Sequence, residues 1–131
     1  MKVESGKWKV MESILEQKSF QFAVRIVNSY KYIRDTQKEY TLSKQLLRSG
    51  TSIGANITEA QQAQSKADFV SKLQIALKEA NETRFWLNLL FETGYIDEKL
   101  FKELDDKCTR LRVMLITSCK TTKNNMSNDI L

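Results

Sequence analysis

The stretch Thr41–Gln64 constrains the fold more than any other part of the chain. Its apolar residues, such as Leu46 and Ile53, recur at helical spacing on one stripe. Gly50 and Gly54 nevertheless lie in its middle, and a glycine inside a helix costs about 1 kcal/mol relative to alanine. Two glycines four residues apart remove side-chain bulk from one face, so another helix backbone can approach closely. We therefore expect a tightly packed helix within a helical bundle.

The segment before it also has helical periodicity, although its start is ambiguous. We expect residues 1–12 to form a flexible N-terminal leader. The helix then begins at Ser13, in a capping box with Glu16, or at Ser19, and it ends before the break at residues 36–40. Its apolar arc is wider than one seam of a bundle requires. Either this helix is deeply buried, or part of the arc meets another subunit.

The second half of the chain predicts two more helices. Ser65 caps the first of them, and Gly94 follows its end as the left-handed residue that closes many helices. Asp97 caps the last helix, and we expect residues 122–131 to form a frayed tail. Absence of proline fits a mostly helical chain. The fold class predicted for residues 13–121 is an all-α, antiparallel up-down-up-down four-helix bundle.

Small and polar residues recur at the centre of the predicted bundle. Ala76 and Ala80 lie on the apolar stripe of the third helix, so we expect them to face the thin middle of the glycine-bearing helix. Whether the glycine side faces its own bundle or a neighbouring subunit stays open at this point. Beside it we expect glutamates to pair with Arg48 and Arg84 in a structural polar cluster that specifies one packing arrangement. The cluster comprises Arg48, Ser52, Asn56, Glu59, Glu79 and Glu82.

The residue types argue against catalysis. The chain has no histidine, which removes the usual general base and the commonest metal ligand. Di-iron helical bundles use a Glu-x-x-His spacing, which is therefore absent. Cys108 and Cys119 fall on an apolar helix face, too far apart to bridge, and are expected to be buried structural thiols. We predict a non-enzymatic protein without a metal or cofactor.

The charge balance is compatible with a nucleic-acid partner. The net charge is +5 and is spread along the chain, without a basic block. Such a charge favours contacts with phosphates, and aromatic residues near the cations could stack on bases. The expected nucleic-acid-binding residues are Lys18, Arg25, Lys31, Arg34 and Lys44. Lys18, Arg25 and Tyr32 lie about two turns apart on one face of the first helix, and this pattern favours a solvated face over a phosphate-contacting stripe.

The sequence also predicts where the protein resides. No apolar run approaches the roughly 20 residues that span a bilayer. The polar start of the chain lacks the apolar core of a signal peptide. Unpaired cysteines fit a reducing compartment. We expect a cytoplasmic protein without a membrane partner.

Three stretches carry a resemblance to a known family: KSFQFAVRIVNSYKYI, LSKQLLRSGTSIGANITEAQ and DFVSKLQIALKEANETRFWLNLL. The chain resembles, from about Lys18 to Thr121, the four-helix-bundle proteins encoded within bacterial 23S rRNA intervening sequences. Leu46–Ala60 is the most specific part of the match. The resemblance implies a short up-down bundle that assembles as a ring-like homopentamer. Family members are mostly of unknown function, and no catalytic residue carries over.

The chain is also similar to the accessory variability proteins of diversity-generating retroelements. Those proteins form basic pentameric barrels that bind nucleic acid and a reverse transcriptase. This likeness implies RNA or DNA and a polymerase-like protein as partners. The leading hypothesis is thus an oligomeric accessory nucleic-acid-binding protein, and the alternative is a protein–protein scaffold or adaptor that binds no nucleic acid. Clustering of the expected cations along one rim favours the first hypothesis, and scatter favours the second.

Overall fold

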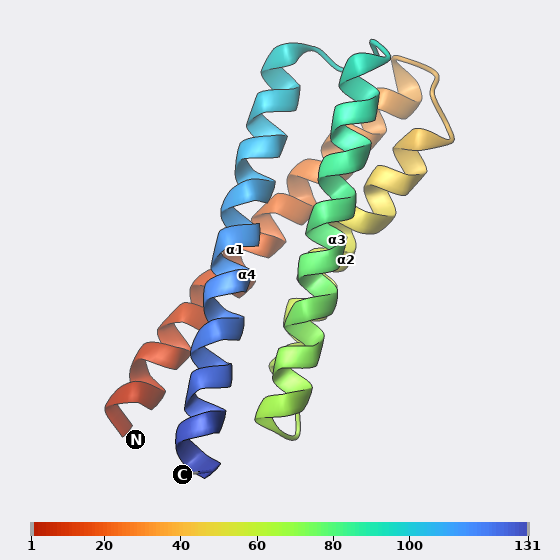
Figure 1. The fold of residues 1–131 in the computed structure, drawn as a ribbon. Coiled ribbons are helices and arrows are strands. Elements are labelled where there is room, and N and C mark those ends of the chain that lie inside the picture. The colour runs from red at the N-terminus through yellow and green to blue at the C-terminus, as the bar shows by residue number, and fades with distance from the viewer. Residues whose placement is uncertain (1, 131) are drawn as a thin grey trace.

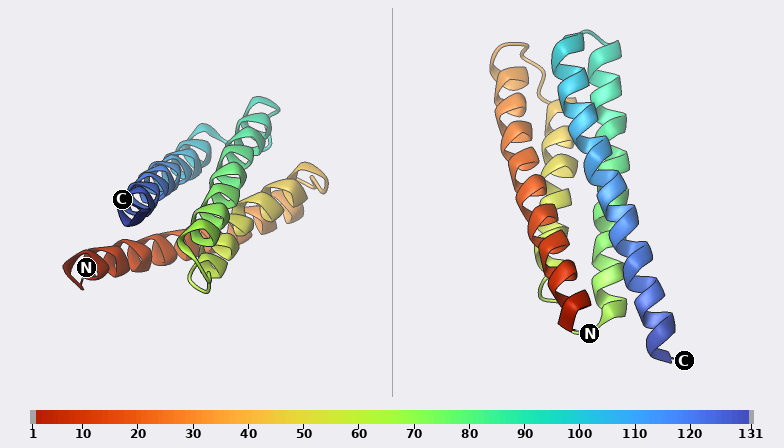
Figure 2. Two further views of the ribbon diagram at one scale, coloured as in Figure 1. Left: turned by 60° about the horizontal axis from the view of Figure 1, so that its bottom comes forward. Right: turned by 90° about the vertical axis from the view of Figure 1, so that its left-hand side faces the viewer.

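Four helices, which run alternately up and down, make up the described part of the chain (Figures 1 and 2). The computed structural model describes residues 2–130, with side chains from residue 13 to 126. The helices are α1 (Lys2–Asp35), α2 (Leu42–Ala60), α3 (Lys66–Glu92) and α4 (Glu98–Ile130). Each helix packs against the helices that precede and follow it in the chain, and α4 also packs against α1. The predicted all-α, up-down-up-down bundle is confirmed.

The helix bounds differ from expectation at both ends of the chain. Helix α1 begins at Lys2, so the expected start at Ser13 or Ser19 is wrong. Ser19 is buried inside the helix, where its hydroxyl donates to the carbonyl of Glu16 instead of capping. Without a proline to stop it, a nucleated helix adds further turns at little cost. Helix α4 likewise continues past residue 121 to its end at Ile130.

The flexibility expected of the two terminal segments stays a prediction. The side chains of residues 1–12 and 127–131 lie outside the described residues.

Local capping signals fix the connections around α3. The Ser65 hydroxyl accepts a hydrogen bond from the backbone N–H of Asp68, as expected for its cap. At the other end Gly94 has φ +84°, the left-handed conformation that ends many helices. The Asp97 carboxylate then accepts from the backbone N–H of Leu100 in the first turn of α4. These expectations are confirmed.

The connection between α1 and α2 contains a cap that sequence analysis missed. Thr41 precedes α2 but makes no side-chain capping bond. Instead, the Glu39 carboxylate, in a residue only 9% exposed, accepts from the backbone N–H groups of Thr41, Leu42 and Ser43 at 3.0, 2.9 and 2.7 Å. Lys38 has φ +55°, a conformation uncommon outside glycine, which turns the chain there. Glu39 therefore supplies the acceptors that the first turn of α2 needs.

The glycine face of α2 packs on α1, which corrects the expectation that it faces Ala76 and Ala80 of α3. A Cβ atom at Gly50 would lie 2.8 Å from Cγ1 and Cγ2 of Ile26. The nearest atom to a Cβ at Gly54 would be the carbonyl oxygen of Ser19, at 3.4 Å. The spacing of the two glycines correctly predicted that another helix approaches α2 closely, but it did not predict that this helix is α1.

The small residues of α3 serve other contacts. The carbonyl oxygen of Ala80 accepts a hydrogen bond from the Cys108 thiol of α4, with 3.3 Å between sulfur and oxygen. Between α2 and α3, the buried hydroxyl of Thr83 donates to the buried hydroxyl of Ser49 at 3.0 Å. A single buried hydroxyl pair of this kind fixes the register of two helices more than it adds stability.

Candidate nucleic-acid interface

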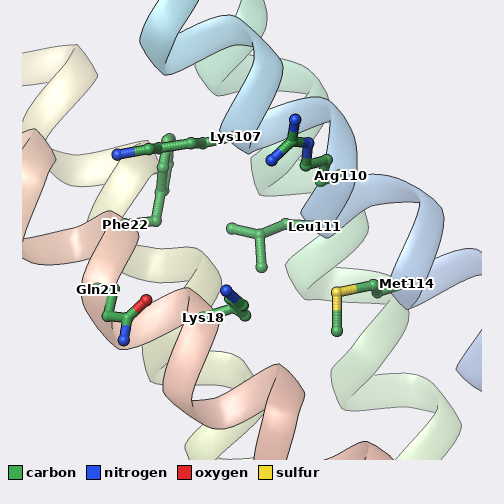
Figure 3. A pocket seen from close by; sticks show the side chains of 7 residues that line it. All are labelled: Lys18, Gln21, Phe22, Lys107, Arg110, Leu111 and Met114. Atoms are coloured by element: carbon green, nitrogen blue, oxygen red, sulfur yellow. The ribbon is translucent and has the colours of Figure 1, made fainter.

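The candidate site is a groove between α1 and α4. Within the described part of the chain, these two helices touch each other less than any other neighbouring pair. The right-hand view of Figure 2 looks onto this side, with α2 and α3 visible behind the two helices. A cavity of about 220 Å³ opens into the groove. Its lining residues, drawn in Figure 3, are Lys18, Gln21, Phe22, Lys107, Arg110, Leu111 and Met114.

Helical spacing brings these side chains together. Lys18, Gln21 and Phe22 lie within one turn on the α4-facing side of α1. On α4, residues three and four apart share a face, which places Lys107 and Met114 on the side towards α1. The site is therefore formed by two short helical segments almost 90 residues apart in the sequence.

The groove combines a cationic rim with an apolar floor. Lys18, Lys107 and Arg110 are exposed, and none of the three forms an ion pair with another residue in the described part of the chain. Figure 3 shows Lys107 extended from α4 towards α1. The floor consists of the buried Phe22 and Leu111, with the half-buried thioether of Met114 beside them. Unpaired cations at the edge of a hollow attract anions, phosphate above all.

An ion pair crosses the groove next to this cavity. The Arg25 guanidinium of α1 lies 2.6 Å from the Glu103 carboxylate of α4. Beyond it lies a shallower hollow of about 300 Å³. That hollow is lined by Arg25, Asn28, Ser29, Tyr32, Asp97 and Leu100.

The five cations expected to bind nucleic acid do not gather on one rim. Lys18 alone lines the main cavity, whereas the charge of Arg25 is neutralised by Glu103. Arg34 pairs with the adjacent Asp35 and lies 5.2 Å from the centre of the Tyr30 ring. The remaining two are exposed on different helices, Lys31 on α1 and Lys44 on α2. This scatter favours the scaffold hypothesis for these residues as a set.

The residues predicted from the sequence did not include Lys107 and Arg110, which complete the cationic rim around Lys18. Both flank Leu111 on the edge of the apolar stripe of α4. Their position at the edge of an apolar stripe could have identified them, because cationic side chains at such an edge lie beside the neighbouring helix. Which neighbour that is depends on the packing of the bundle.

Part of the expected structural polar cluster forms between α2 and α3. The Arg48 guanidinium lies 3.3 Å from the Glu79 carboxylate and also pairs with Glu82. On α2, the Ser52 hydroxyl donates to the carbonyl of Arg48 at 2.6 Å, and the Asn56 amide donates to the carbonyl of Ser52 at 2.8 Å. Of these side chains, that of Arg48 is exposed and the other four are half-buried, so the cluster is partly buried, as expected.

Two other charged residues that were expected to pair here, Glu59 of the cluster and Arg84 beside it, have different partners. Glu59 pairs with Lys72, whose ammonium nitrogen lies 3.3 Å from its carboxylate. Arg84 pairs with Asp105 of α4 at 2.9 Å, so its expected pairing with the glutamates is wrong. Arg84 lies on the side of α3 that faces α4, while Glu79 and Glu82 lie on the side that faces α2. Angular position on the helix decides the partner.

Both cysteines are free and buried, as expected. Burial, assisted by the charge of Asp105, raises the pKa of the Cys108 thiol to about 12. Burial also raises the pKa of the Cys119 thiol. Thiols with raised pKa values are poor nucleophiles at neutral pH.

The described residues contain no group of three or more histidine, cysteine, aspartate or glutamate side chains arranged to hold a metal ion. None of their helices is long and apolar enough to cross a membrane.

The fold and groove define a helical-bundle protein with a cationic, apolar-floored surface, and comparison with known proteins gives its family. The family model described as 23S rRNA-intervening sequence protein matches residues 11–117. The chain belongs to this family. It is similar to the crystal structure of a protein with unknown function from the S23 ribosomal protein family of Bacteroides thetaiotaomicron, with 54% identity and a TM-score of 0.83. That match covers 84% of this chain and 98% of the other. No curated protein matches the chain.

Proposed function

We propose that the protein is a non-enzymatic, homo-oligomeric bundle that binds RNA or DNA through the groove between α1 and α4. The observation that carries the proposal is the set of three exposed, unpaired cations, Lys18, Lys107 and Arg110, around one cavity. Unlike Arg25 or Arg34, these side chains have no neutralising carboxylate partner among residues 13–126, whose side chains the structure describes. Such groups release counterions from a phosphate backbone, which is the main source of affinity for nucleic acids.

The overall charge supports the same proposal. Each chain carries a net charge of +5. Five copies in a ring would together carry about +25, which attracts polyanions over several ångströms.

We further propose that the protein acts in the cytoplasm.

An exposed apolar strip on α1 supports the oligomer. Phe20 is 70% exposed and Val24 is 45% exposed, one turn apart on the outer side of α1. The apolar arc of this helix is therefore wider than its own bundle covers. Of the two explanations for a wide arc, deep burial and contact with another subunit, these exposed side chains favour the second. Contiguous exposed apolar side chains often mark protein contacts. A homopentamer is the assembly that we propose.

The same strip supports the second candidate function, a protein scaffold without nucleic-acid binding. A scaffold would use exposed apolar side chains to hold subunits or a polymerase-like partner, and the scattered cations would only keep it soluble. The likeness to accessory variability proteins, from which that partner was expected, stays a prediction. Salt dependence separates the two functions, since only phosphate binding weakens steeply as salt rises.

The first test removes the two rim cations of α4. The double variant Lys107→Gln/Arg110→Gln should bind an RNA fragment about tenfold more weakly in an electrophoretic shift assay at about 50 mM salt. Its log–log salt slope should fall by roughly 1.5 to 2, because two phosphate contacts are lost. Both side chains are exposed, so the fold is expected to persist.

Lys44→Gln/Lys78→Gln is the matched control for this test. Lys44 precedes Arg48 by one turn and Lys78 precedes Glu82 by one turn, so both lie on the α2–α3 side, opposite the groove. This control removes the same charge and should bind like the unaltered protein. Equal weakening of both variants would show that only net charge matters, and absence of salt-sensitive binding would leave the scaffold.

The oligomer is tested on the apolar strip of α1. Phe20→Glu should yield a smaller assembly by light scattering coupled to gel filtration, because it places a charge in the proposed subunit contact. Phe85→Glu is the control, since Phe85 is 58% exposed on α3. A monomeric unaltered protein, or an unchanged Phe20→Glu assembly, would contradict the proposed contact.

A further inference from the structure

The apolar floor of the α1–α4 cavity is not required for binding phosphates. Phosphates require only Lys18, Lys107 and Arg110, yet the side chains beneath these cations are the apolar Phe22, Leu111 and Met114. An anion gains nothing from an apolar floor, because desolvating a charge there is costly. The arrangement fits a partner with an anionic part and a less polar part side by side.

We propose that this cavity takes one unstacked nucleobase, so that the protein selects single-stranded or bulged RNA over duplex RNA. The inference rests on the proposed nucleic-acid binding and adds the form of the nucleic acid. In this arrangement the flanking phosphates lie against the three cations while the base enters between α1 and α4. Stacking or apolar contact with a base does not depend strongly on its identity, so the preference is for strandedness rather than sequence.

The size of the cavity fits a single ring system. Its volume of about 220 Å³ is several times the roughly 30 Å³ that one water occupies in the liquid. It is smaller than the roughly 300–1,000 Å³ typical of pockets for drug-sized ligands. A cavity between these limits has room for one heterocycle and none for a stacked pair.

Gln21 provides the polar contact that a base edge requires. Its side chain is exposed, lines the cavity and forms no hydrogen bond with another described residue. Figure 3 shows its amide group beside Lys18 on the α1 side. An amide offers two donors and an acceptor, so it can pair with any base edge. Gln21 thus complements the apolar floor without selecting one base.

Duplex RNA cannot use this cavity. In an A-form helix the bases are stacked inside, and the protein meets phosphates and sugar hydroxyls. A duplex would engage the rim cations but leave the floor hydrated. An unpaired nucleotide can turn its base outwards and fill the cavity, as single-stranded RNA does when it binds aromatic and apolar side chains. The floor therefore contributes only to single-strand binding.

The probes for the test are three labelled RNAs of about 12 nucleotides, within the site sizes usual for single-strand binding. One is single-stranded, the second is its duplex with the complement, and the third is the same strand with abasic nucleotides. Fluorescence anisotropy at fixed salt should show about tenfold tighter binding of the intact single strand than of either other probe. Equal affinities for the intact and abasic strands would overturn the inference.

Two variants locate the effect at the cavity. Met114→Trp fills the cavity without changing charge, and should remove most of the single-strand preference while duplex affinity stays the same. Gln21→Ala alters only an exposed side chain, so it is expected to fold, and should weaken single-strand binding a few-fold without affecting the duplex. If neither variant changes the preference, the base does not bind in this cavity.

The two proposals fail differently. If no RNA shows salt-sensitive binding, the proposed function itself fails. If all three probes bind equally and Lys107→Gln/Arg110→Gln weakens them all, the cationic groove stands and the base-binding cavity is wrong. A stronger affinity for the duplex would also overturn the inference, because the rim alone would then determine binding.

Discussion

Replacing Glu39 with alanine is expected to lower the free energy of unfolding by about 2 kcal/mol. The substitution leaves three backbone N–H groups at the start of α2 without their charged acceptor. The loss also removes a negative charge from a helix N-terminus, where it is favourable. Urea unfolding at pH 7 measures the effect. Asp106→Ala is the control: it removes an exposed carboxylate beyond the first two turns of α4 and should change stability by less than about 0.5 kcal/mol.

The effect of Glu39 should depend on pH in a defined direction. Burial alone would raise the pKa of the Glu39 carboxyl, but hydrogen bonds from the backbone of Leu42, Ser43 and Thr41 outweigh it and hold the pKa below its ordinary value of 4.5. A carboxyl whose pKa is lowered by folding stabilises the protein fully above the unfolded pKa, and this contribution is lost as pH falls through the folded pKa.

Comparison with Glu39→Gln isolates the charge. The stability difference between the unaltered protein and this variant should be constant from about pH 6 to 7 and shrink progressively below about pH 4.5. Unfolding measured in urea at several pH values across this range provides the comparison. A difference that stays constant down to pH 3 would mean that the Glu39 carboxylate is not the acceptor that fixes α2.

The second large effect concerns the two glycines of α2. Gly54→Ala should be more stable than Gly50→Ala by about 1–3 kcal/mol. Both variants gain the same helix propensity, so the propensity term cancels in the difference. A Cβ at Gly54 meets only ordinary contact distances, whereas at Gly50 it would lie 2.8 Å from two carbons of Ile26. Ile26 cannot rotate away easily, because its branched side chain is stiff at χ1.

A double-mutant cycle tests this assignment. In an Ile26→Ala background the clashing carbons are gone, so Gly50→Ala should no longer destabilise the protein. The coupling energy between the two positions should be at least about 1 kcal/mol. Additive effects would place the steric limit at another contact. Thermal unfolding of the four proteins, with circular dichroism to confirm the helix content, measures the cycle.

Local signals in the sequence predicted much of this fold. The caps at Ser65 and Asp97 and the left-handed Gly94 involve residues within a few positions of each other, so their geometry follows from the sequence directly. Apolar periodicity likewise identified four helices and their core faces. The Glu39 cap escaped notice because a glutamate three residues before the first residue of a helix is not a usual capping residue.

The candidate site was harder to predict because it depends on which helices become neighbours. Periodicity places Lys18 and Lys107 at the edges of their stripes, but it does not show that these edges meet. The same ambiguity assigned the glycine face to α3 rather than α1, and Arg84 to the glutamates rather than Asp105. Contacts between distant segments follow from the packing of the whole bundle, whereas caps follow from a few residues.

The ion pair between Arg25 and Glu103 has a consequence for the shape of the binding surface. Its side chains are 36% and 38% exposed, so water screens the pair and it adds little to stability. It nevertheless separates the cavity around Lys18 from the shallower hollow at Tyr32. Because the two charges cancel, the attraction for phosphates is interrupted at that point. For the proposed function, this means a contact of one or two nucleotides per subunit, and in the proposed assembly longer nucleic acids would be held by repetition of that contact.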